Sequence, residues 1–168
     1  MIKVDNIAVL LIDMQEGFTE YIPTDYFNKL IRAQRSVINY LGNNDIPLVV
    51  LEYKPIYYGE TDSALLDAIN CVQKTIFISK KSKSGFKQTN LRRILSCFNR
   101  KNLYLMGVYA DQCVKATAQD AINDGYNIAT SGDVISEVNG RLSTTWFEEN
   151  GLFTKTYKGM IQRLEKSL

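Results

Sequence analysis

Cys113 is the residue of this sequence that is best placed to act as a nucleophile. It follows the apolar run 102–108 by a few turn residues and falls in the first turn of a predicted helix. The free N–H groups and the positive dipole end of a helix favour a thiolate there, and they also offer donors to a developing oxyanion. The alternative, a small buried apolar residue, is the interpretation we adopt for Cys71 and Cys97, which lie in apolar helical contexts.

Asp13 and Lys80 each close an apolar strand-like run, and together with Cys113 they offer a mechanism. An aspartate after an apolar strand is costly unless it is hydrogen-bonded or has a chemical task. A partly buried carboxylate can take the thiol proton, a nearby ammonium can balance the charge, and the thiolate can attack an electrophilic carbon. A turn or cap residue remains the alternative for Asp13, and a surface lysine remains the alternative for Lys80.

The absence of histidine narrows the chemistry further. Without histidine, neither Ser-His-Asp nor Cys-His catalysis is available, nor is any metal site that needs imidazole. The three cysteines are widely spaced and contain no C-x-x-C pair, which argues against a disulfide framework and for a reducing compartment. The start of the chain lacks a signal-peptide pattern, and no apolar run is long enough to cross a bilayer. We therefore expect a soluble, cytoplasmic protein that uses no metal and no cofactor.

The charge balance gives little support to a nucleic-acid partner. The 20 basic and 18 acidic residues give a net charge of +2, so only a local cluster could bind a polyanion. The best cluster consists of Lys80, Lys81, Lys83 and Lys87. It lacks interleaved aromatic residues and is more typical of a solvated strand end, so we expect a small-molecule substrate and neither a nucleic-acid nor a membrane partner.

The elements that must position these residues alternate between strand and helix. With 45% hydrophobic and 23% charged residues, the 168-residue chain is ordinary for one globular domain, and we expect a single domain over residues 1–168. Strands are predicted at 7–12, 46–53, 75–79, 102–108, 126–131 and 153–157. Helices are predicted at 24–41, 62–69, 88–98, 111–123 and 144–149 and from residue 159, with a loop at 54–60. This alternation predicts a three-layer α/β fold, a mainly parallel sheet with helices on both faces.

The active edge of such a sheet is formed by the carboxyl ends of its strands, where ligands bind. Asp13, Lys80 and the segment 107–113 all fall at those ends. Aromatic residues predicted near this edge are candidates for substrate contacts, although packing is an equally common role for them. They are Phe18, Tyr53, Tyr58, Phe86 and Tyr109. Trp146 fits either the pocket or a subunit interface.

Three sequence motifs resemble those of the isochorismatase-like cysteine hydrolases. They read LIDMQEGF at 11–18, KKSKSGF at 80–86 and GVYADQCV at 107–114. Each motif alone is weak, but the three occur in the family's order and roughly its spacing, over about residues 5 to 135. The resemblance implies the same three-layer fold and a catalytic Asp-Lys-Cys triad. The triad would consist of Asp13, Lys80 and Cys113, with Lys81 as the fallback for the lysine.

The resemblance also implies a cis peptide bond between Val108 and Tyr109, and oxyanion donors from the backbone N–H groups of Tyr109 and Cys113. Nicotinamidases of this superfamily bind a metal with an aspartate and histidines after the second strand, whereas this chain reads Glu52, Tyr53, Lys54 there. A metal-free branch outside the nicotinamidases is therefore expected.

True isochorismatases lack the nucleophilic cysteine, so Cys113 favours a hydrolase that cleaves a small amide through a covalent acyl-enzyme. The alternatives are a non-hydrolytic small-ligand or redox protein on the same fold, and a vinyl-ether hydrolase of the isochorismatase type. Relatives commonly form dimers or larger assemblies, so we also expect a homo-oligomer. Asp133, where relatives often have Asp-Ala, is expected to be structural.

Overall fold

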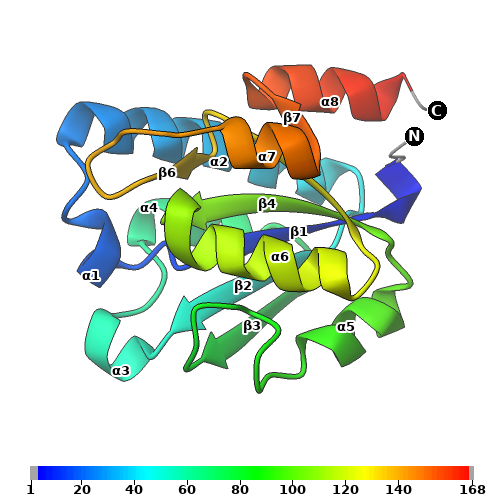
Figure 1. Cartoon of the computed structure of the whole chain (residues 1–168), viewed down its shortest axis with the longest axis horizontal. Coiled ribbons are helices and arrows are strands. Elements are labelled where there is room, and N and C mark those ends of the chain that lie inside the picture. The colour runs from blue at the N-terminus through cyan, green and yellow to red at the C-terminus, as the bar shows by residue number, and fades with distance from the viewer. Residues whose placement is uncertain (1–3, 167–168) are drawn as a thin grey trace.

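The computed structural model describes residues 4–166 and has a parallel sheet of seven strands at its centre (Figure 1). The strand order is β3-β2-β1-β4-β5-β7, and the short β6 also pairs with β4. The strands are β1 (Ile7–Ile12), β2 (Leu48–Tyr53), β3 (Thr75–Lys80), β4 (Asn102–Val108), β5 (Asn127–Ser131), β6 (Ile135–Ser136) and β7 (Leu152–Thr154). Because every pair is parallel, the carboxyl ends of neighbouring strands lie at the same edge.

The helices flank this sheet on both faces, so the predicted α/β fold is confirmed. Figure 1 shows α6 in front of the strands, with α2 and α4 behind them. The helices are α1 (Glu16–Thr19), α2 (Thr24–Asn43), α3 (Pro55–Tyr58), α4 (Ser63–Ile69), α5 (Leu91–Phe98), α6 (Lys115–Asn123), α7 (Thr145–Asn150) and α8 (Tyr157–Glu165). A 3-10 turn, Val4–Asn6, precedes β1, and a π-helical turn, Ala110–Val114, leads into α6. No helix within residues 4–166 is long and apolar enough to cross a membrane.

The central strands form as predicted because their sequences are apolar on both faces. Every residue of β1 and of β4 is buried, which is the pattern of strands covered by helices on both sides. Ile12 pairs with Leu51 on one side and with Gly107 on the other, so the ends of β1, β2 and β4 are level.

Gly107 allows β1 and β4 to approach closely beside the active edge. Its φ is 129°, and a Cβ at this position would lie 2.0 Å from the carbonyl oxygen of Ile12. Only a residue without a side chain fits there.

The remaining differences from the predicted elements fall at their ends and in short turns. The predicted loop 54–60 contains α3, which begins at Pro55, a residue well suited to the first helical position. The helix predicted from residue 88 begins only at Leu91, because Gln88 has a left-handed backbone with φ 56°. The helix predicted from residue 111 begins as the π-helical turn, whereas α1 and β6 were not predicted because each is too short for a periodic pattern.

Candidate active site

Asp13, Lys80 and Cys113 come together at the carboxyl ends of β1, β3 and β4. Lys80 Nζ lies 2.8 Å from Asp13 Oδ2, and the two side chains are 0% and 2% exposed. Cys113 is half-buried, and its thiol is close enough to this pair that Asp13 raises the pKa of Cys113 and Cys113 lowers the pKa of Asp13. A buried carboxylate and a buried ammonium therefore lie beside the sulfur.

Lys80 uses all three of its N–H donors within the protein. Its ammonium donates to Asp13 Oδ2 and to the backbone carbonyl oxygens of Ser82 and Lys83, at 3.1 and 3.0 Å. With no proton left for a substrate, Lys80 supplies charge and position rather than a hydrogen bond to a ligand. Lys81 is exposed, so of the two candidate lysines the structure places Lys80 against the carboxylate.

Asp13 keeps one carboxylate oxygen unoccupied. Oδ2 accepts from Lys80, whereas the buried Oδ1 has no hydrogen-bond partner in the described part of the chain. Burial raises the pKa of Asp13, and the Lys80 ammonium and the Cys113 thiol oppose that rise. A carboxylate with a raised pKa and an unused oxygen is suited to accept a proton.

The Cys113 thiol has a raised pKa. Burial raises its pKa to about 12, and the negative charge of Asp13 acts in the same direction, although Lys80 partly opposes the rise. The expectation that a helix N-terminus favours a thiolate here is therefore wrong. The residue lies in the π-helical turn ahead of α6, where burial and the charge of Asp13 both favour the neutral thiol.

Thr117 connects the loop after β3 to the turn that carries the cysteine. Its buried hydroxyl accepts a hydrogen bond from the Gly85 backbone N–H at 3.0 Å and donates one to the Cys113 carbonyl oxygen at 2.7 Å. Thr117 lies just beyond the motif at 107–114, and no role was predicted for it. Because both of its partners belong to segments of the active edge, Thr117 fixes their separation.

Tyr109 follows a cis peptide bond with Val108. The Tyr109 hydroxyl donates to the Phe18 carbonyl oxygen at 2.6 Å, and burial raises the pKa of this tyrosine to about 12. The hydroxyl is therefore a neutral donor that ties β4 to α1 across the active edge.

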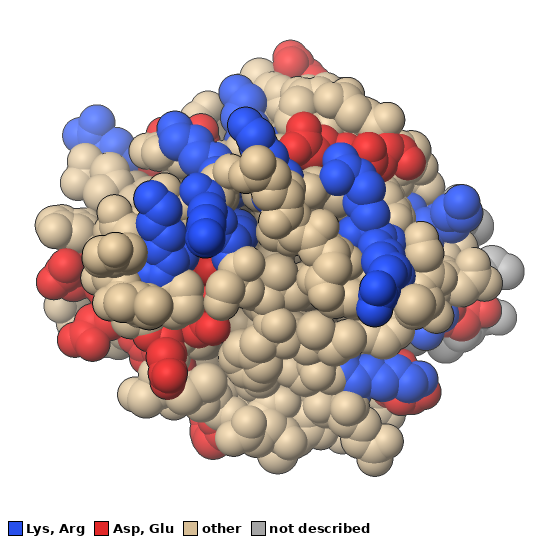
Figure 2. Space-filling view, turned by 90° about the horizontal axis from the view of Figure 1, so that it is seen from below, with Lys and Arg blue, Asp and Glu red and all other residues tan. Residues whose placement is uncertain are grey.

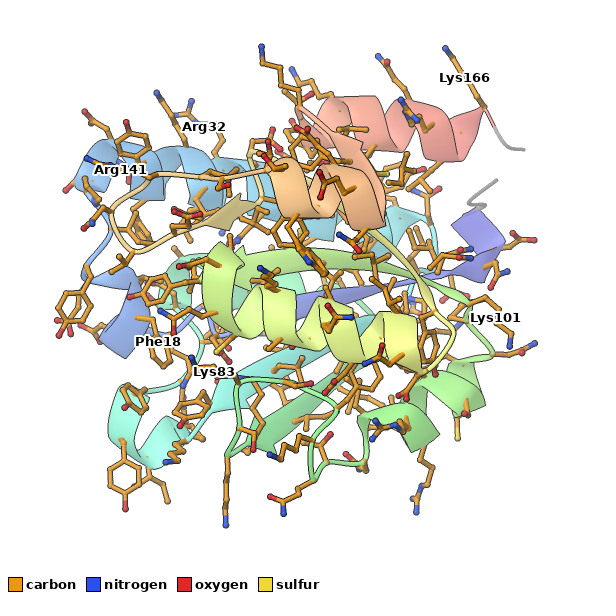
Figure 3. All side chains as sticks on the ribbon, in the orientation of Figure 1. Phe18, Arg32, Lys83, Lys101, Arg141 and Lys166 are labelled. Atoms are coloured by element: carbon orange, nitrogen blue, oxygen red, sulfur yellow. The ribbon has the colours of Figure 1, made fainter. Side chains whose placement is uncertain are left out.

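Four of the five predicted pocket residues form one aromatic group: Phe18, Tyr53, Tyr58 and Tyr109. The Phe18 ring stacks on Tyr58 at 4.6 Å and meets the rings of Tyr53 and Tyr109 edge-on at 6.1 and 6.0 Å. Lys80 Nζ lies 4.9 Å from the centre of the Tyr53 ring, so the group borders the buried ion pair. Figure 3 shows Phe18 and Lys83 at the same end of the sheet.

The fifth residue, Phe86, is not brought to this group. It is fully buried, its ring lies 5.9 Å from that of Tyr126, and Arg92 lies over it at 5.4 Å. Trp146 packs edge-on against Phe147 and has the Lys115 ammonium 5.5 Å from its ring. Phe86 is thus a core residue, although its neighbours in the sequence are polar.

Glu52 occupies the position at which a metal ligand would be sought. One of its carboxylate oxygens, Oε2, accepts hydrogen bonds from the Thr61 backbone N–H at 2.6 Å and from the Thr61 hydroxyl at 2.9 Å. Across residues 4–166, no three His, Cys, Asp or Glu side chains are grouped so as to hold a metal ion. The structure thus gives Glu52 a role in fixing the loop after α3.

Three further residues can be compared with their predicted roles. Cys71 and Cys97 are exposed, so their interpretation as buried apolar residues is wrong, because both lie on the outward faces of their segments. Asp133 accepts a hydrogen bond from the Tyr157 backbone N–H at 2.8 Å, a structural role of the kind predicted.

A separate hollow of about 690 Å³ lies at the opposite end of the sheet. It borders the first residues of β4 and β5, Asn102 and Asn127, and the apolar side chains of Ile122 and Leu152. Because it contains no nucleophile and no buried acid–base pair, the site at the carboxyl edge remains the candidate for catalysis.

Comparisons with known proteins agree with this fold. The family model of the Isochorismatase domain matches residues 7–150. The chain is 22% identical over 161 residues to isochorismatase domain-containing protein 2 of Xenopus laevis, which covers 94% of this chain and 75% of that protein. Among solved structures, it is similar to the MAR1 ribonuclease of Caenorhabditis elegans, with 25% identity, a TM-score of 0.84, and coverage of 97% of this chain and 83% of that one.

It is also similar to a nicotinamidase of Staphylococcus aureus, with 20% identity, a TM-score of 0.77, and coverage of 90% of this chain and 99% of that one. The family model spans most of the chain, and the structural neighbours share its parallel sheet and flanking helices. The chain therefore belongs to the isochorismatase family.

Proposed function

We propose that this protein is a cysteine-dependent hydrolase that cleaves the C–N bond of a small amide. The observation that carries the proposal is the unoccupied Asp13 oxygen, buried beside the Cys113 thiol and held in place by Lys80. A carboxylate, a thiol and an ammonium in this arrangement can perform nucleophilic acyl transfer without histidine.

In the first step, Asp13 takes the thiol proton as the Cys113 sulfur attacks the carbonyl carbon. The negative charge that develops on the carbonyl oxygen would be stabilised by the backbone N–H groups of Tyr109 and Cys113. When the tetrahedral intermediate collapses, the C–N bond breaks and Asp13 returns its proton to the leaving amine. Water then attacks the acyl-enzyme, releasing a carboxylic acid and restoring the thiol.

The pKa shifts suit this sequence of proton transfers. A thiol with a pKa of about 12 does not ionise alone at neutral pH, so attack requires that a base take the proton. Burial raises the pKa of Asp13 and so brings it closer to that of the thiol. The Lys80 ammonium offsets the charge of Asp13 before transfer and that of the sulfur after it.

The test is a panel of small amides and ureas assayed for ammonia or amine release. We expect turnover of at least one compound, and loss of that turnover in Cys113→Ser and Cys113→Ala, with the exposed-cysteine variant Cys97→Ser as the control. Turnover should also survive a strong chelator. Full activity in both Cys113 variants would exclude the thiol mechanism, and a requirement for zinc or iron would contradict the metal-free proposal.

A second candidate function is RNA cleavage, favoured by the similarity to the Caenorhabditis elegans ribonuclease. Figure 2 shows two groups of Lys and Arg side chains on the face seen from below. In the segment after β3, Lys81, Lys83 and Lys87 are exposed, whereas Lys80 is buried and inaccessible to a polyanion. The test is to incubate RNA with the unchanged protein and, separately, with its Cys113→Ala variant. If both proteins cleave the RNA, the ribonuclease activity does not depend on the Cys113 thiol.

The predictions of cytoplasmic location and of a homo-oligomer also belong to this proposal. Light scattering on the purified protein measures the assembly directly. We expect a dimer or a larger species, and a monomer at micromolar concentration would refute that expectation.

A further inference from the structure

Gln15 has a buried side-chain amide whose hydrogen bonds all go to one neighbouring segment. Its Oε1 accepts from the Tyr53 backbone N–H at 2.7 Å. Its Nε2 donates to the carbonyl oxygens of Tyr53 and Gly59, at 3.1 and 2.6 Å. The amide thus pairs with the last residue of β2 as a neighbouring strand would, and it also holds the residue that follows α3.

The segment 53–59 is therefore held at both of its ends by one side chain. Between these ends the chain turns through Lys54 and Gly59, which have φ values of 38° and 80°. An isolated antiparallel bridge between Gln15 and Thr61 continues the attachment. Without the Gln15 amide, two carbonyl oxygens and one N–H of this segment would lose their partner.

The same segment carries two members of the aromatic group. Tyr53 lies over Lys80, and Tyr58 stacks on Phe18 with an angle of 14° between the rings. The contact between α1 and α3 is tight, since a Cβ on Gly17 would lie 2.9 Å from the Tyr58 carbonyl oxygen. The positions of both tyrosines over the site therefore depend on where Gln15 holds their backbone.

We propose that Gln15 is a positioning residue. It fixes the two tyrosines of the aromatic group, Tyr53 and Tyr58, and thereby limits the size of the chemical group that can reach Cys113. The inference rests on the proposed function only in taking Cys113 as the reacting residue. Gln15 itself is saturated by backbone partners, so it acts through Tyr53 and Tyr58 and not by touching a ligand.

Thiol alkylation tests this proposal without a known substrate. In a Cys71→Ser/Cys97→Ser background, the rates of Cys113 alkylation by iodoacetamide and by the bulkier N-phenyl iodoacetamide are compared. We expect Gln15→Met to raise the ratio of bulky to small reagent rates by about tenfold, which corresponds to about 1.4 kcal/mol. Hydrogen exchange should also become faster across residues 53–61.

Gln34→Met is the matched control, because Gln34 is also a fully buried glutamine. Its amide donates to Met14 Sδ at 3.4 Å and to the Val134 carbonyl oxygen at 3.0 Å, away from the segment 53–59. This variant should lose stability without changing the reagent ratio. An equal change of the ratio in both variants would show general loosening and would overturn the proposal, as would an unchanged ratio in Gln15→Met.

If Gln15→Met does not fold, Gln15→Glu serves as the second variant, because it keeps the side-chain shape and the acceptor. The carboxyl group that this substitution introduces has at most one proton to donate, so it cannot donate to the carbonyl oxygens of both Tyr53 and Gly59. The ratio should again rise, and an unchanged ratio refutes the role. If no amide of the panel is hydrolysed, the proposed function is refuted. The alkylation ratio still tests the role of Gln15, because alkylation needs only the Cys113 thiol.

Discussion

Removing the ammonium of the buried pair, by Lys80→Met, tests the electrostatics of the site. The change leaves the Asp13 carboxylate, 2% exposed, without its counter-charge and without the hydrogen bond that Oδ2 accepts from Lys80. Breaking a buried ion pair on one side costs about 3–5 kcal/mol. Domains of this kind are stabilised by about 5–15 kcal/mol in total, so the loss should be a large share of the free energy of unfolding.

The loss depends on pH because Asp13 can become neutral by binding a proton. Burial already raises the pKa of Asp13, and removing Lys80 removes the main influence that lowers it. In the unfolded chain the carboxyl has a pKa of about 3.9. Between that value and the raised folded value, the folded state binds more protons, so the unfolding free energy falls as pH rises, by up to about 1.4 kcal/mol per pH unit.

Urea unfolding followed by circular dichroism from pH 5 to pH 8 measures both effects. The set comprises the unchanged protein, Lys80→Met, Asp13→Asn and the double variant. The double variant should recover most of the loss and have a flatter pH dependence, because neither buried charge remains. The reasoning is refuted if Lys80→Met is within about 1 kcal/mol of the unchanged protein at every pH, or if the double variant loses the sum of the two single losses.

Three further predictions follow from single contacts. Thr117→Val should lower the free energy of unfolding in urea by about 1–3 kcal/mol, because it leaves the buried Gly85 N–H unpaired, and it should also alter the rate of Cys113 alkylation. The control Thr130→Val should lower the stability without altering that rate. Gly107→Ala should prevent stable folding because its Cβ meets the β1 backbone, whereas Gly125→Ala, which has φ 86° and open space, should cost about 1–2 kcal/mol. Cys113 alkylation should rise with pH up to about pH 11, in line with a thiol pKa of about 12, and a plateau near pH 8 would contradict the burial effect.

Much of the fold follows from the sequence because buried parallel strands leave a distinct pattern. The runs at β1 and β4 are apolar on both faces, and their parallel arrangement brings the residues after each strand to one edge. This geometry places Asp13 and Lys80 at one edge, and the long Lys80 side chain reaches Asp13 from β3, across the end of β2. Short elements such as α1 and α3 were not predicted as helices, because four residues contain too little periodicity to be distinguished from a turn.

Other features of the site depend on burial, which a local sequence pattern does not determine. The helix-dipole argument for Cys113 gave the wrong direction of its pKa shift, because it took no account of burial or of the charge of Asp13, which both raise the pKa. Phe86 lies near the motif lysines in sequence, yet its ring packs in the core. The position of Gln15 two residues after Asp13 was visible, but its partners are 38 and 44 residues away and could not be identified.

The position of β3 at the edge of the sheet affects how the active site is lost when the protein begins to unfold. Within the described sheet, β3 is paired only with β2, yet it carries Lys80 into the buried pair. Edge strands separate from a sheet more readily than central strands, through local openings that cost less than global unfolding. Each such opening would withdraw the ammonium and expose Asp13 to water. An edge strand thus sets the lifetime of the assembled site, and activity should disappear under milder heating or lower urea than the loss of the sheet itself.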